Sequence, residues 1–74
     1  MSAMLAADYA DRTVEALERL YAALEARRDQ ATIVAKECNE AHDWNGFEKA
    51  FGMSLAYGTA LLDVYAALLE EKRR

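Results

Sequence analysis

The nine residues "CNEAHDWNG", 38–46, separate two long segments that each have the composition and spacing of an α-helix. The 74-residue chain has no proline, and its glycines, Gly46, Gly52 and Gly58, all lie in its second half, so nothing before residue 38 interrupts a helix. Asn, Asp and Gly between residues 39 and 46 are typical of a turn. We therefore expect a single all-α domain spanning residues 1–74, an antiparallel hairpin with helices at about 2–39 and 46–72 and a turn at 40–45.

The first segment has the heptad pattern of a bundle helix, with Ser2 as its expected N-cap. With Leu17 at position a, the a and d positions are mostly small and apolar. The a positions are Ala3, Ala10, Leu17, Leu24, Ala31 and Cys38, and the d positions are Ala6, Thr13, Leu20, Arg27 and Val34. Position e widens this seam with Ala7, Val14, Tyr21 and Ala35. On the opposite face, Asp8 with Arg12 and Glu15 with Arg19 form favourable i, i+4 pairs.

The second segment begins with Asn45 as its expected N-cap and Glu48 as the capping-box partner. Two apolar stripes run along it. The first holds Phe47, Ala50, Tyr57, Leu61, Val64 and Leu68, and the second holds Phe51, Leu55, Leu62, Tyr65 and Leu69. A helix that is apolar over most of its circumference needs more than one neighbour. Since this chain supplies only one other helix, we expect a homodimer whose four helices form one bundle.

Small residues in the second helix support this expectation, because Gly52 with Ala56 and Ser54 with Gly58 recur at the four-residue spacing that lets another backbone approach closely. The same spacing occurs in transmembrane helices, and residues 50–69 contain only one charge, Asp63. A membrane span is therefore the alternative for this helix. Asp63, two hydroxyl residues and two tyrosines interrupt the roughly 20 apolar residues that a span requires, so burial in a protein core is favoured over membrane insertion.

The charge distribution excludes one class of partner. The chain has 13 acidic and 9 basic residues, and it has no basic stripe that could follow a phosphate backbone, so we expect no direct nucleic-acid binding. The start, "MSAMLAADYADR", lacks the basic n-region of a signal peptide. Cys38 is the only cysteine, which excludes an intrachain disulfide and fits a reducing compartment. These features predict a cytoplasmic protein.

Cys38 and His42 are the closest approach to a chemical site. Their i, i+4 spacing could place both on one metal, with Glu37 or Asp43 adding oxygen ligands. Two such side chains do not make a tetrahedral set, so we interpret Cys38 as a small core residue and His42 as a solvated turn residue. The sequence also lacks a Glu-x-x-His motif and a glycine-rich phosphate loop, and no oxyanion-stabilising loop is recognisable. We expect no metal, no cofactor and no enzymatic activity.

Five residues of the first helix are candidates for binding a protein. The first helix is longer than the second, and its overhang carries Met4, Leu5 and Tyr9, which have no apolar partner in their own chain. Arg27 and Arg28 interrupt the heptad seam. They are placed either to reach an acidic group on a partner or to extend into water from a widened bundle.

Trp44 is the sixth candidate, either as a lid over the end of the hairpin core or as an exposed binding anchor. The setting of Trp44-Asn45-Gly46 between two helices resembles the Trp-x-Gly family of small helical hairpins exported by type VII secretion systems. That resemblance implies a secreted hairpin. The family's export signal has an acidic residue four positions after a tyrosine, whereas here Tyr57 and Tyr65 are followed by leucines.

Two functions are therefore expected. The first is a non-enzymatic module that binds an unidentified protein partner and regulates or inhibits a larger complex, by analogy with the small acidic inhibitors that phages and other mobile elements encode. The alternative is a secreted hairpin of the Trp-x-Gly type.

Overall fold

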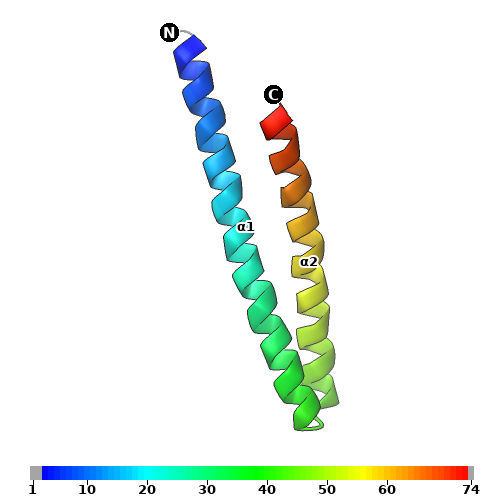
Figure 1. The fold of residues 1–74 in the computed structure, drawn as a ribbon. Helices are drawn as coiled ribbons and strands as arrows, with labels where there is room; N and C mark the ends of the chain where they lie inside the picture. Colours follow the sequence, from blue (N-terminus) through cyan, green and yellow to red (C-terminus); the bar gives the residue numbers. More distant parts are fainter. Residues whose placement is uncertain (1–2, 74) are drawn as a thin grey trace.

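Two long antiparallel helices make up the structure, a computed structural model that describes the backbone of residues 3–73 and the side chains of residues 12–73 (Figure 1). Helix α1 spans Ala3–Glu40 and helix α2 spans Trp44–Arg73. The molecule measures 60 × 14 × 12 Å, and its radius of gyration is 17.2 Å, whereas a compact domain of this length would have a radius near ~11 Å. The predicted all-α hairpin is confirmed, and its shape is a rod in which each helix has one neighbour.

The turn is a Schellman motif built on His42. The Asp43 amide donates to the Cys38 carbonyl at 2.8 Å, and the His42 amide donates to the Asn39 carbonyl at 3.2 Å, so two terminal carbonyls of α1 are satisfied. The motif requires a left-handed residue, and His42 takes it with φ of 59°. Glycine usually occupies this position, because any side chain is strained there.

Helix α2 begins two residues earlier than expected, because Asp43 and not Asn45 is its N-cap. The Asp43 carbonyl accepts from the Phe47 amide at 2.9 Å, and its Oδ1 accepts from the Gly46 amide at 3.1 Å. Gly46 thus occupies the third helical position, so the expected capping box of Asn45 and Glu48 is wrong. A Cβ on Gly46 would lie 2.5 Å from Asp43 Oδ2 and 2.8 Å from Cys38 Sγ, so only glycine fits here without movement of the cap.

The contact between the helices uses the expected first stripe of α2 but a different seam of α1. On α2, Ala50, Leu61 and Leu68 are buried, and the other members of that stripe, Phe47, Tyr57 and Val64, are half-buried. On α1 the covered residues occupy positions a and e: Val14, Leu17, Tyr21, Leu24, Arg28, Ala31, Ala35 and Cys38. The d positions Leu20, Arg27 and Val34 are exposed, so the expected a/d seam is wrong.

Side-chain size explains how the two helices approach each other. Near the turn the seam consists of small residues, including Ala31 and Ala35 on α1 with Ala50 on α2, and Thr32 Oγ1 lies 2.9 Å from Ser54 Oγ across it. Towards the open end the seam consists of larger residues such as Leu61 and Leu68, and the ribbons lie farther apart (Figure 1). The hairpin is therefore closest at its turn and widens towards the termini.

The core is thin. Five described residues are buried, three of them alanines, and none of the described side chains is completely removed from solvent. Since a large aliphatic side chain contributes about 1.5–3 kcal/mol only when fully buried, this core provides little stabilisation to one isolated chain. The Glu15–Arg19 pair forms as predicted, at 3.4 Å, but both side chains are exposed and add little.

Candidate protein-interaction surfaces

Helix α2 carries a second line of apolar side chains that α1 does not cover. We call this line the second stripe: Trp44, Phe51, Leu55, Leu62, Tyr65 and Leu69. Each of the six is between 39% and 70% exposed. With Gly58 included, the positions from residue 51 to residue 69 alternate by four and three, the spacing of a helix-packing seam. Trp44 lies seven residues before Phe51 and so extends the same line to the turn, a register that the sequence already contains.

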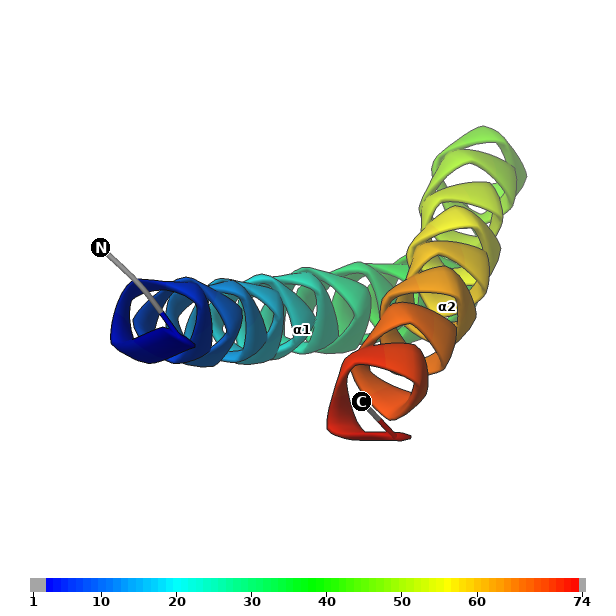
Figure 2. The same ribbon diagram turned by 90° about the horizontal axis from the view of Figure 1, so that it is seen from above.

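The second stripe faces away from α1. Its members follow buried positions by one residue, as Phe51 follows Ala50 and Leu62 follows Leu61, and one residue is about 100° around a helix. Seen along the hairpin, α1 covers α2 from one side only (Figure 2). An angle of about 100° is close to the right angle between the two neighbours of a helix in a four-helix bundle, so the second stripe is placed to pack against another helix.

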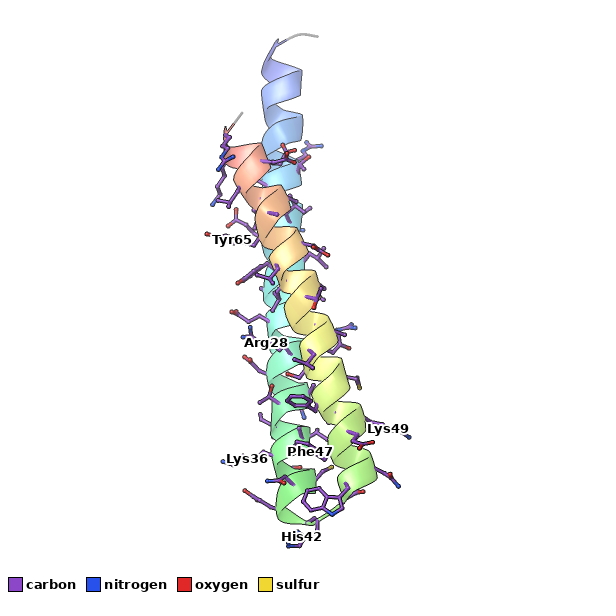
Figure 3. The ribbon with its side chains drawn as sticks, turned by 90° about the vertical axis from the view of Figure 1, so that its right-hand side faces the viewer. Arg28, Lys36, His42, Phe47, Lys49 and Tyr65 are labelled. Carbon is purple, nitrogen blue, oxygen red and sulfur yellow. The ribbon has the colours of Figure 1, made fainter. Side chains whose placement is uncertain are left out.

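Trp44 belongs to this exposed surface and is not buried as a lid over the core. It is 57% exposed, and its ring lies 5.8 Å from the His42 ring and 6.4 Å, edge-on, from the Phe47 ring. The Phe47 ring stacks at 5.6 Å on that of Phe51. These rings connect the turn to the second stripe, and Figure 3 shows His42 and Phe47 at this end of the hairpin.

Two glycines of α2 have no explanation within the chain. A Cβ on Gly52 or Gly58 would meet no atom within 4 Å, although glycine inside a helix costs about 1 kcal/mol relative to alanine. Gly58 lies in the line of the second stripe, whereas Gly52 lies on the polar strip of α2. Close approach of another molecule would account for Gly58, and we have no physical account of Gly52.

Arg27 and Arg28 lie on different faces and do not form a joint site. Arg27 borders a shallow groove of about 360 Å³ between the helices, together with Val34, Met53 and Tyr57. Arg28 is half-buried in the seam, and its Nη2 lies 3.2 Å from Oδ1 of Asp29. Met53, which the sequence interpretation assigned to no surface, is 52% exposed on this groove.

Figure 3 shows Arg28 on the same side of the hairpin as Tyr65, and Lys49 on the opposite side. The Arg27 groove and the second stripe are therefore two separate surfaces of the hairpin.

The overhang is present as backbone. Helix α1, at 38 residues, continues past the end of the 30-residue α2 (Figure 1). Met4, Leu5 and Tyr9 belong to this part of α1, and their side chains lie outside the described residues, as does that of Asp8.

The environment of Cys38 is one of packing. Its thiol is half-buried against Gly46, and His42 is exposed beside Trp44. Within residues 12–73, no three His, Cys, Asp or Glu side chains are gathered closely enough to hold a metal ion.

By length and composition, α2 is also a weak candidate for a membrane span. An 18-residue window of it has a mean hydropathy of 1.3, and 17% of that window is buried in the hairpin. This exposure follows from the uncovered second stripe.

Comparison with known proteins adds no further constraint: no protein-family model matches the chain, and neither a curated protein nor a solved structure matches it significantly. The structure defines the class, a two-helix antiparallel hairpin. The resemblance to the Trp-x-Gly family rests on the hairpin layout and on Trp44-Asn45-Gly46 alone.

Proposed function

We propose that this protein is a non-enzymatic protein-binding module that works as a homodimer and regulates a larger protein complex. The observation that carries the proposal is the second stripe. Its six side chains expose roughly 600 Å² of surface on one helix face, taking an aromatic residue as 150–250 Å². That area is at the upper end of the largest apolar patches on monomeric proteins, about 300–600 Å², and such patches mark interaction sites.

The character of the described surfaces favours binding over catalysis. Among residues 12–73 no polar or charged side chain is buried, whereas enzymes place polar groups in water-excluded sites where their electrostatic effect is large. The grooves beside the helices are open and mostly apolar, as at Val34 and Met53. A surface of this kind suits a helix or an extended segment of another protein.

Homodimerisation would supply the missing neighbour of α2 and would bring four helices into one bundle. It would also leave surfaces for a target, since the Arg27 groove lies on the side of the hairpin away from the second stripe. Arg27 at its edge is placed to pair with an acidic group of that target.

The first experiment measures mass and target capture separately. Light scattering at micromolar concentration should report about twice the 8.3 kDa chain mass. The purified protein, used as bait in a lysate of its native host, should capture one defined complex, and Arg27→Glu should reduce that capture. Arg19→Glu is the matched control, because Arg19 is exposed on the outer face of α1 and pairs only with Glu15 in the described contacts. Equal capture by the two variants would remove the Arg27 groove from the proposal.

A further inference from the structure

We propose that two copies of the chain pair through their second stripes, with the two α2 helices antiparallel and Gly58 of each chain at the two-fold axis. This inference rests on the proposed homodimer and adds the face, the direction and the register of the contact. Four observations on α2 carry it: the position of Gly58 in the stripe, the open space above it, the charges at the ends of the helix and the exposed area.

Gly58 is the centre of the second stripe. Phe51 and Tyr65 lie seven residues before and after it, and Leu55 and Leu62 lie three before and four after. An antiparallel two-fold through Gly58 therefore sets Phe51 opposite Tyr65 of the second copy and Leu55 opposite Leu62 of the second copy. Every large side chain then meets another large apolar side chain across the contact.

The space around Gly58 fits a close helix crossing. A Cβ there would meet nothing within 4 Å in its own chain, so the hairpin itself does not require glycine at this position. At the axis, however, two helices come nearest each other, and residues without side chains permit the closest approach. Gly58 is the smallest residue of the line and sits between larger ones on both sides.

The charges at the two ends of α2 select the antiparallel direction. Trp44 lies 14 residues before Gly58 and Lys72 lies 14 residues after it, so the two-fold brings the Lys72 ammonium to the exposed Trp44 ring of the second copy, a cation–π arrangement. The same pairing brings Arg73 near Glu48 of the second copy, about one turn away from that contact. A parallel pair would instead set Glu48 against Glu48 and Lys72 against Lys72, which is repulsive.

The exposed area matches a second copy. A standard interface buries about 800 Å² per partner. The second stripe exposes roughly 600 Å² of this on aromatic and leucine side chains, and the polar residues at its margins supply the rest. The same residues thus form the central apolar part of an interface with a charged rim, the usual anatomy of a protein–protein contact.

Disulfide cross-linking tests the face and the direction together. In a Cys38→Ala background, Gly58→Cys should form an intermolecular disulfide under mild oxidation, because the two Cα atoms at the axis come within the roughly 7 Å that a disulfide spans. Phe51→Cys should not cross-link, since in the antiparallel pair the two positions lie about 21 Å apart along the helices. Gly52→Cys is the control on the polar strip, and it should not cross-link either.

Each pattern of cross-linking has one meaning. Cross-linking at position 58 alone supports the inference. Cross-linking at both 58 and 51 shows a parallel pair and overturns it. A dimer by light scattering with no cross-link at 58 overturns the inference and leaves the homodimer standing on another face, whereas a wild-type monomer overturns both. Co-sedimentation of the wild type with phosphatidylcholine vesicles, together with a monomer in their absence, would assign the second stripe to lipid and also overturn it.

A second pair of variants keeps the test independent of chemistry at cysteine. Gly58→Leu and Gly52→Leu gain the same helix propensity, and neither side chain meets an atom of its own chain at Cβ. Gly58→Leu should weaken dimerisation at least tenfold by holding the helices apart, and Gly52→Leu should leave the dimer dissociation constant within about twofold. Equal dissociation constants for the two variants would overturn the inference. Target capture by the Gly58→Leu bait is scored separately and reports on the proposed function.

Discussion

Replacing Leu62 with alanine separates a covered α2 from an exposed one. Leu62 is 70% exposed in the hairpin. The change removes three carbon groups worth about 0.8 kcal/mol each when buried, or about 2.4 kcal/mol in all. Only the 70% that a second copy would newly cover counts towards association, which gives about 1.7 kcal/mol per chain and about 3.4 kcal/mol per dimer. At about 1.4 kcal/mol per factor of ten, the dimer dissociation constant should rise roughly 200-fold.

Sedimentation equilibrium over a dilution series measures this constant directly. The matched control is Ile33→Ala, because Ile33 is 51% exposed and lies two residues from both Ala31 and Ala35, on the opposite face of α1 from the seam. Its dissociation constant should stay within about twofold of the wild type, as surface substitutions usually change stability by less than about 0.5 kcal/mol. If Leu62→Ala and Ile33→Ala associate equally well, α2 is not covered at Leu62 and the reasoning from the second stripe is refuted.

Three further changes probe the hairpin itself, each by urea unfolding at a fixed protein concentration. Asp43→Ala should lower the free energy of unfolding by about 1 kcal/mol through loss of the cap on Gly46, and Asp43→Asn should retain most of it; equal losses would exclude capping. His42→Gly should raise the unfolding free energy by about 0.5–1 kcal/mol by relieving the left-handed strain, and a loss would show that its contact with Trp44 matters more. Leu61→Ala should cost about 2–3 kcal/mol, since Leu61 is only 4% exposed, and a loss under about 1 kcal/mol would contradict its place in the core.

The helical pattern of the sequence was sufficient to predict the hairpin, and the first stripe of α2 is the stripe that α1 covers. The choice of seam on α1 was not predictable, because positions a and d and positions a and e are both separated by three and four residues. Arg27 at d and Arg28 at e break the two seams equally. The partner helix decides between them: pairing Ala31 and Ala35 with the small residues of α2 near the turn allows close packing, which places Arg27 outside.

The turn shows a second limit of sequence interpretation. Asn45 followed by Glu48 has the spacing of a capping box, and on propensity it is a good helix start. The Schellman motif at the end of α1 ends on Asp43, which can itself cap the next helix at once. A left-handed histidine made this short connection possible, and histidine gives no clear sequence signal for that conformation. The register of Trp44 with Phe51, by contrast, could have been read from their spacing of seven residues.

The thin core also has a consequence for how long the chain survives in a cell. With three alanines among its five buried residues, a single hairpin has a small free energy of unfolding. Any molecule that binds only the folded hairpin raises its folded fraction by mass action, and proteases act on the chain when it is open. Copies made in excess of their binding sites are therefore degraded first. The abundance of this protein should follow the abundance of what it binds, so that its supply is matched to demand without a dedicated regulator.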